Sequence, residues 1–134
     1  MTQEDKELLL KDLCDRLQYG LKCSIYRVDD FGVGWRDATL KGTYFDDYGS
    51  EFYFDDYVCV DSINKVKPYL FPMSSMTEEQ GNEFGLLQAA SIKCEFLYPC
   101  NCANLMRFIY ENHLDYMDLI GKGLALDATD KNIY

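Results

Sequence analysis

The sequence predicts a single α+β domain with an N-terminal helix, an antiparallel sheet of three or four strands, and a helical C-terminal half packed on the sheet. Before residue 67, apolar and polar residues tend to alternate, which is typical of strands, and after residue 80 apolar residues recur at helical spacing. Residues 67–80 contain two prolines and a helix-start signal, so they are predicted to be the junction. A chain of 134 residues can bury one core without disulfides or metal.

The first helix is predicted to begin at Thr2 and to end at Gly20. Thr2 is a favourable N-cap residue, and Asp5 lies three positions later. Gly20 suits the left-handed conformation that commonly ends a helix. An apolar stripe at helical spacing should cover one face of the sheet, and it consists of Leu9, Leu10, Leu13, Cys14 and Leu17.

Strands are predicted over residues 22–28, 35–45 and 51–60, with residues 63–70 as a candidate fourth strand. In the second strand, Ala38, Leu40 and Tyr44 share one face, and one of the two faces should meet the core. In the third strand, Asp56 interrupts a run of core-facing apolar residues. A bulge at Asp55 and Asp56 would turn that carboxylate outward.

The C-terminal half is predicted to be helical over residues 78–96, 103–112 and 116–120, followed by an extended tail, 124–134. Two capping-box patterns precede the first of these helices. One pairs Ser75 with Glu78, and the other pairs Thr77 with Gln80. Asp115 is placed to cap the last helix.

The formal net charge of −10 and the pI of about 4.4 disfavour direct nucleic-acid binding, which requires clustered Lys and Arg. The N-terminus is charged and amphipathic, unlike a signal peptide, and no run approaches the roughly 18 apolar residues of a membrane span. We therefore expect a cytoplasmic protein that does not bind membranes. Its six cysteines are then expected to be free thiols.

Three stretches of the chain are distinctive: LLLKDLCDRLQYGLKC (8–23), KPYLFPMSSMTEEQ (67–80) and ENHLDYMDLIGKGLALDATDKNIY (111–134). Together they cover a little over a third of the chain and resemble a group of small proteins encoded by gut bacteria and by their phages or mobile elements. The resemblance implies no activity, cofactor or catalytic residue. A phage or mobile-element setting would imply a protein that counters host defence or takes over a host factor.

The most unusual sequence feature is a repeated pentapeptide, YFDDY, at residues 44–48 and 53–57. A turn is predicted between the two copies, so antiparallel pairing would bring them side by side. Residues 29–61 contain nine acidic and two basic side chains, which account for −7 of the net charge. Like charges gathered on one small hairpin repel each other, so we expect something to offset this repulsion.

Three interpretations of this acidic hairpin remain open. It can be a solvated edge that aids solubility, or a surface that binds a basic partner protein, including by mimicry of nucleic acid. A Ca²⁺ or Mg²⁺ site is the third, although the ordered EF-hand loop pattern is missing. The predicted partner-binding residues are Tyr44, Asp46, Asp47, Tyr48, Tyr53, Asp55, Asp56 and Tyr57.

A second candidate surface lies around the glycines at 32 and 34. Tyr26 and Trp35 offer aromatic rings, and Arg27 and Arg36 offer cations, a combination that suits a nucleotide ligand. This pocket would make the protein a sponge for a signalling nucleotide. The alternative is structural aromatic residues beside surface arginines.

Soft metal ligands occur at Cys94, Cys100, Cys102 and His113, but their spacing is not a zinc-site pattern, and no metal or cofactor is expected. His113 could activate Cys100 or Cys102 as a nucleophile, although no spacing marks such a pair. A lone histidine near a helix end and beside Asp115 is usually a capping or surface residue. The phosphate-loop and hydrolase motifs are missing, so we expect no catalysis.

The sequence therefore favours a small, acidic, non-catalytic binding protein that inhibits a host defence factor by covering a basic surface on it. The alternatives are a nucleotide sponge, whose pocket can lie across a homo-oligomer interface, and a structural or housekeeping domain. An enzyme would require a cleft that joins His113 to a perturbed cysteine or carboxylate.

Overall fold

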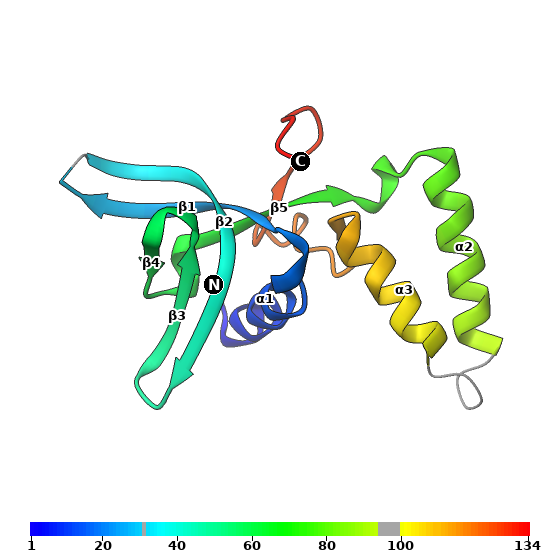
Figure 1. The fold of residues 1–134 in the computed structure, drawn as a ribbon, viewed down its shortest axis with the longest axis horizontal. Helices are drawn as coiled ribbons and strands as arrows, with labels where there is room; N and C mark the ends of the chain where they lie inside the picture. The colour runs from blue at the N-terminus through cyan, green and yellow to red at the C-terminus, as the bar shows by residue number, and fades with distance from the viewer. Residues whose placement is uncertain (31, 94–99) are drawn as a thin grey trace.

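The computed structural model describes residues 1–30, 32–93 and 100–134 and shows an α+β fold (Figure 1). The elements of the first half are α1 (Gln3–Asp15), β1 (Lys22–Asp29), β2 (Gly32–Asp46), β3 (Gly49–Phe54), β4 (Val58–Val60) and β5 (Val66–Pro72). Those of the second half are α2 (Glu78–Lys93), α3 (Cys100–Glu111), β6 (Leu114–Asp115) and β7 (Leu126–Asp127). Among the described helices, none is long and apolar enough to cross a bilayer.

The sheet is larger than the sequence predicts. Its seven strands run in the order β4-β3-β2-β1-β5-β6, and β7 also pairs with β5. The strands from β1 to β5 pair antiparallel, whereas β6 and β7 lie parallel to β5. The prediction of three or four strands is wrong for two reasons: the predicted third strand is two strands, and the residues after α3 add two short ones, β6 and β7.

The predicted third strand folds back on itself. A 3₁₀ turn, η2 (Asp55–Tyr57), separates β3 from β4, and the two strands pair antiparallel with Phe54 opposite Val58. Both of these side chains are buried. The expected bulge is therefore wrong, because the polar residues between Phe54 and Val58 reverse the chain completely. Tyr57 closes the turn with a φ of 59°.

A bulge does occur in β2, where the pairing register shifts between Leu40 and Gly42. An extra residue on one strand moves all following side chains to the opposite face. Leu40 is buried in the core, but Tyr44 points away from it, and Thr43 lies opposite the buried Phe52. The prediction that Leu40 and Tyr44 share a face is therefore wrong.

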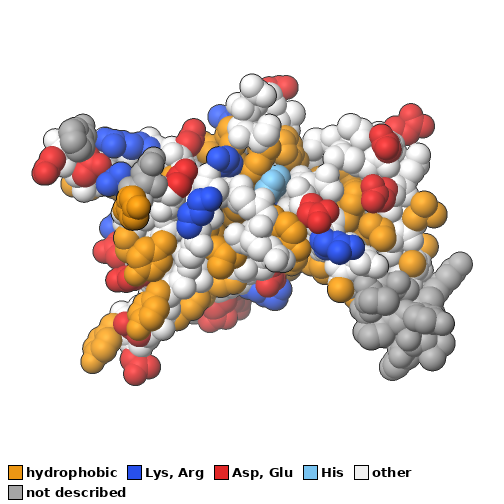
Figure 2. Space-filling model, viewed as in Figure 1, with side chains coloured by type: hydrophobic (Ala, Val, Ile, Leu, Met, Phe, Trp, Pro, Cys, Tyr) orange, Lys and Arg blue, Asp and Glu red, His pale blue; other side chains and the backbone are white. Residues whose placement is uncertain are grey.

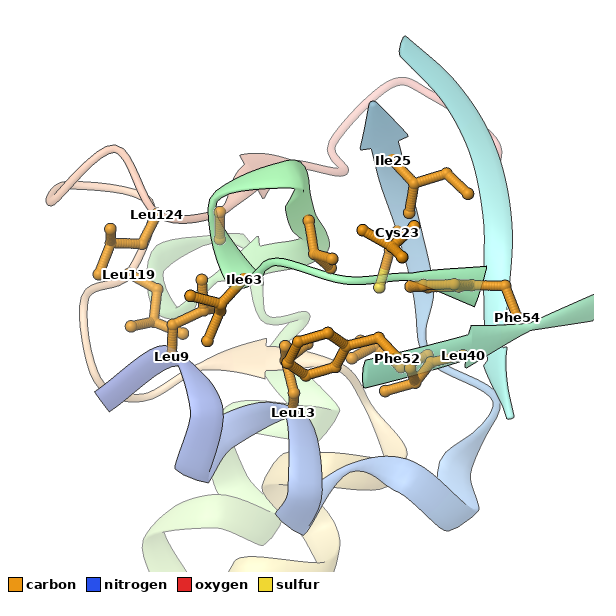
Figure 3. Close-up of a cluster of buried hydrophobic side chains, with 14 of the residues drawn as sticks. Leu9, Leu13, Cys23, Ile25, Leu40, Phe52, Phe54, Ile63, Leu119 and Leu124 are labelled. Atoms are coloured by element: carbon orange, nitrogen blue, oxygen red, sulfur yellow. The ribbon is translucent and has the colours of Figure 1, made fainter. Parts of the chain in front are cut away.

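The main core lies between the sheet and α1 (Figure 3). Leu9 and Leu13 of α1 are fully buried and face side chains from the sheet, among them Phe52 and Leu40. The tail after β6 closes one end of this core with Leu119, Leu124 and Ala125. The apolar stripe predicted for the first helix is confirmed at its centre.

The capping motifs in the sequence correctly predicted where α1 and α2 begin. The Thr2 hydroxyl accepts a hydrogen bond from the Asp5 backbone N–H, and the Asp5 carboxylate accepts one from the Thr2 N–H, each at 3.1 Å. Thr77 and Gln80 make the same reciprocal pair before α2. Gly20 has a φ of 68°, as predicted for the residue that ends the first helical segment.

The helical hairpin formed by α2 and α3 lies beyond one end of the sheet (Figure 1). Its expected packing across the sheet is wrong, because α1 covers that face and the hairpin builds a smaller apolar cluster of its own. This cluster centres on Phe108, Ile109 and Leu114 and includes Phe84 of α2 and Phe71 of β5. The hairpin therefore meets the sheet at the ends of β5 and β6.

The last predicted helix, 116–120, is a series of turns. The Asp115 carboxylate still caps it, because its two oxygens accept hydrogen bonds from the backbone N–H groups of Leu119 at 2.7 Å and Ile120 at 2.9 Å. Asp115 is buried, and these two hydrogen bonds give both of its carboxyl oxygens a partner.

Candidate functional site

The first YFDDY copy, residues 44–48, forms the end of the hairpin between β2 and β3. Strand pairing places Asp46 opposite Gly49, which leaves Asp47 and Tyr48 as the two turn residues. The Asp46 carboxylate accepts a hydrogen bond from the Tyr48 backbone N–H at 2.9 Å. Gly49 has a φ of 148°, which side chains rarely permit. Asp46 and Gly49 therefore fix the turn, whereas Asp47 has no hydrogen bond in it.

Aromatic side chains around this turn are strongly exposed. The exposed fraction is 98% for Tyr48, 53% for Tyr44, 47% for Phe45 and 41% for Tyr53. Phe45 lies on one face of the hairpin and Tyr44 and Tyr53 on the other. Figure 2 shows hydrophobic and acidic side chains together at this end of the molecule. We call this surface the hairpin tip, and define it as Tyr44, Phe45, Asp47, Tyr48 and Tyr53.

The second YFDDY copy, residues 53–57, begins on β3 and leads away from the turn. Tyr53 pairs with Gly42, and the chain then enters η2. The Asp55 carboxylate accepts a hydrogen bond from the Thr39 backbone N–H at 2.9 Å, so it has a structural role. The predicted side-by-side pairing of the copies is wrong, because the turn falls within the first copy and not between the two.

The structure thus divides the eight predicted partner-binding residues into two groups. Tyr44, Asp46, Asp47, Tyr48 and Tyr53 lie on the turn and its flanking strands, and Asp55, Asp56 and Tyr57 lie in η2. Tyr57 is fully exposed there, while the Asp56 side chain lies outside the described part of the structure. A single partner surface can cover the first group without reaching the second.

The predicted nucleotide pocket is divided between the two faces of the β1–β2 hairpin. Tyr26 pairs with Trp35, and their rings meet edge to face with 5.6 Å between centroids. Arg36 pairs with Ile25, which is buried in the core, so Arg36 lies on the opposite face from the two rings. Arg27 lies two residues from Ile25 and therefore shares the face of Arg36.

Both arginines form ion pairs with the Asp29 carboxylate, each with 3.3 Å between nitrogen and oxygen. The cation beside Trp35 is Lys67 of β5, whose Nζ lies 5.9 Å from the ring centroid. The prediction that Arg27, Arg36 and the aromatic pair line one pocket is wrong. Neighbouring residues of a strand point to opposite faces, and the sequence alone did not show which residues face the core.

The candidate metal ligands are only partly described. Cys94 and the side chain of Cys100 lie outside the described residues. Cys102 is exposed, and its sulfur accepts a hydrogen bond from the Ser91 hydroxyl at 3.6 Å. Among the residues that the structure describes, no group of three or more His, Cys, Asp or Glu side chains is placed to hold a metal ion.

A cleft of about 350 Å³ lies where the sheet meets the helical hairpin. Its walls come from the end of β5, the start of α2, the end of α3 and the tail, and include Phe71, Gln80, Glu111, Asn112, His113 and Tyr134. No local motif marks this cleft, because residues separated by more than 60 positions build it. Of these lining residues, only His113 was a candidate functional residue in the sequence.

His113 lies in this cleft and is only 8% exposed. Its ring stacks on Tyr134 with 3.7 Å between centroids and 14° between planes. Its backbone carbonyl accepts a hydrogen bond from the Phe71 N–H at 2.8 Å, which fixes it to β5 even though its φ is 53°. Burial, and secondly the positive charge of Arg16, lower the pKa of His113 to about 4. The imidazole is therefore neutral at neutral pH.

The pH dependence of stability should include a contribution from His113, the only histidine of the chain, beside that of Asp12, whose pKa is raised by burial. The ordinary pKa of 6.5 applies in the unfolded chain, so acid protonates the unfolded state first. The free energy of unfolding should be at its full value above pH 6.5 and fall by about 2 kcal/mol between pH 7.5 and pH 5. Urea unfolding at a series of pH values measures this loss.

The matched variant is His113→Phe, which keeps a ring against Tyr134 but cannot be protonated. Its free energy of unfolding should fall less than that of the wild type between pH 7.5 and pH 5. The difference between the two decreases should be about 2 kcal/mol. Parallel pH profiles of the two proteins would show that His113 is not the group responsible. Exposed carboxylates with lowered pKa values, Asp5, Asp61 and Asp127, titrate below this pH range.

The comparisons with known proteins give no relative from which a function could be inferred. No family model matches the chain, and no curated protein or solved structure matches it.

Proposed function

We propose that the protein is a non-catalytic binding protein that docks a partner with a basic surface through the hairpin tip. The observation that carries this proposal is the exposure of Tyr48, whose side chain is 98% exposed at the turn and is flanked by Tyr44 and Phe45 on opposite faces. An aromatic side chain can bury about 150–250 Å² on binding, so these few rings supply much of the roughly 800 Å² that a partner typically covers.

The charge around the tip specifies the chemistry of the partner. Asp46, Asp47 and Glu51 lie within the same hairpin as the exposed rings. Carboxylates at the rim of an interface accelerate association with a positively charged partner and disfavour an acidic one. Tyr53 donates a hydrogen bond to Glu51, which holds one ring beside one carboxylate. The tip therefore suits a basic protein surface in which aromatic anchors fill apolar pockets.

Inhibition of a host defence factor is the biological role that we propose for this binding. The resemblance to phage-linked and mobile-element proteins supports it, as does the acidic character of the tip, since nucleic-acid-binding grooves of host proteins are basic. Occupying such a groove would block its normal ligand without any chemical reaction.

Substitution at the tip should abolish partner binding. Tyr44→Ser with Tyr48→Ser removes two anchors and should weaken binding at least 100-fold, because each hot-spot residue typically contributes about 2 kcal/mol or more. Asp47→Lys should weaken binding and reduce its salt dependence. Asp46 and Asp55 are unsuitable for this test, because both make structural hydrogen bonds.

The experiment compares tagged wild-type and variant proteins as baits in the same host lysate, followed by affinity measurements with the purified partner. Val28→Ser with Val33→Ser is the matched control, because these side chains are 72% and 64% exposed on the other hairpin. A basic partner bound by the wild type and the control, but lost from both tip variants, is the expected result. A partner that all four proteins retain, or a partner with an acidic surface, contradicts the proposal.

A further inference from the structure

Two carboxamides in the His113 cleft have fixed orientations. The Oε1 atom of Gln80 accepts a hydrogen bond from the Thr77 N–H at 3.0 Å, and its Nε2 donates to the Oδ1 of Asn112 at 3.2 Å. The Nδ2 of Asn112 donates to the Phe108 carbonyl at 2.8 Å. Each amide nitrogen carries two hydrogens and uses one in these bonds, so each keeps one N–H for a further partner.

His113 supplies a third donor. Its Nδ1 is enclosed without a hydrogen-bond partner among the described residues, so Nε2 is the ring nitrogen left to meet a ligand. An enclosed N–H without an acceptor costs more than an enclosed bare nitrogen, which places the proton on Nε2. The stacked Tyr134 ring is itself anchored, because its hydroxyl donates to the Tyr69 carbonyl at 2.8 Å and accepts from the Lys22 N–H at 3.0 Å.

The other residues that line the cleft limit the size, shape and charge of the ligand that it can bind. Phe71 and Tyr134 offer aromatic surface, with their ring centroids 5.8 Å apart. The described residues that line the cleft include the Glu111 carboxylate and no Lys or Arg, so a phosphate or carboxylate would lack a compensating charge. A volume of about 350 Å³ suits a small molecule, since ligand sites usually start near 300 Å³.

We propose that this cleft binds an uncharged planar heterocycle with a cyclic amide, the chemistry of a nucleoside base such as uracil. The two ring carbonyls of uracil would together accept hydrogen bonds from the Nε2–H of His113 and from the carboxamide N–H groups of Gln80 and Asn112. The ring N–H would donate to an oxygen of the same carboxamides, each of which has accepted one hydrogen bond and has a second lone pair. The ring would lie against the aromatic wall.

The test uses uridine as the probe and the NMR signals of the single histidine ring as the reporter. Without ligand, the ring nitrogen shifts should show the proton on Nε2. Uridine should then shift the ring signals in a saturable way with a Kd below about 1 mM, and uridine monophosphate should bind at least about fivefold more weakly because of its charge. The absence of a saturable shift with uridine, or tighter binding of the monophosphate, would overturn the proposal.

Variants distinguish a cleft that binds an uncharged heterocycle from an aromatic cage that binds a cation. Gln80→Glu keeps the oxygen that accepts the Thr77 N–H but removes the amide donor, and His113→Phe removes the ring N–H. Calorimetry should show that each of these two variants weakens uridine binding about tenfold, while Val28→Ser, on the β1–β2 hairpin and outside the cleft, leaves it unchanged. Binding of choline that Glu111→Gln weakens, or wild-type affinity for uridine in Gln80→Glu and His113→Phe, would refute it. Far-UV circular dichroism confirms that each variant is folded.

Discussion

Replacement of Arg16 by methionine should lower the free energy of unfolding by about 3–5 kcal/mol. Arg16 has no exposed surface, and its Nε donates to the Asp12 carboxylate at 2.8 Å within α1. Its Nη2 donates to the Leu114 carbonyl at 2.7 Å, and its guanidinium lies 5.0 Å from the centroid of the Tyr110 ring. Without Arg16, the Asp12 carboxyl would remain buried with no opposite charge. A domain of this size typically has only about 5–15 kcal/mol of stability in total.

The neighbouring pair in the same helix provides a matched control. Lys11 and Asp15 have the same four-residue spacing, but Lys11 is largely exposed, so Lys11→Met should cost less than about 1 kcal/mol. Replacing both members of the buried pair, Asp12→Leu with Arg16→Met, should recover much of the loss, because no charge is then left unpaired. Urea unfolding of the four proteins measures these differences. An Arg16→Met variant as stable as Lys11→Met would show that the buried pair adds nothing.

Replacement of Phe52 by alanine is the second change with a large expected effect, a loss of about 3–5 kcal/mol. Phe52 has no exposed surface and lies between Leu13 of α1 and Leu40 of β2 (Figure 3). Its removal would leave a cavity between the sheet and the helix that covers it. The cost includes both the lost apolar burial and the contacts that surrounding side chains cannot restore.

The adjacent residue, Tyr53, tests whether the loss of stability depends on the face of β3 on which the side chain lies. Tyr53 is of similar size, lies on the outer face and is 41% exposed, so Tyr53→Ala should cost less than about 1 kcal/mol. Thermal unfolding of the two variants, followed by circular dichroism, makes the comparison. Equal losses for Phe52→Ala and Tyr53→Ala would contradict the assignment of inner and outer faces in β3.

Signals within a few residues were sufficient to predict where α1 and α2 begin and where the first helical segment ends. The reciprocal bonds of Thr2 with Asp5 and of Thr77 with Gln80 depend only on neighbours in the chain. The left-handed Gly20 is equally local. Such features form whenever the right residue types occur at the right spacing, so an isolated sequence is enough to recognise them.

Register and sheet order could not be predicted in the same way. The bulge between Leu40 and Gly42 reverses the faces of everything that follows in β2, and no residue type there requires it. The reversal of the chain at η2 depends on burying both Phe54 and Val58, which becomes apparent only once the core is assembled. The hairpin tip differs from the predicted surface because of the register of the β2–β3 pairing, and the cleft could not be predicted because residues more than 60 positions apart build it.

The hydroxyl of Tyr134 also constrains the order in which the chain folds. It bonds to the backbone of Lys22, 112 positions earlier, and to the carbonyl of Tyr69 in β5. Neither partner is in place until β1 and β5 have paired, and β7 can join only an existing β5. Contacts across such long loops are entropically costly to form early, so the tail docks last. We therefore expect the aromatic wall of the cleft, which Tyr134 completes, to form only when the tail docks.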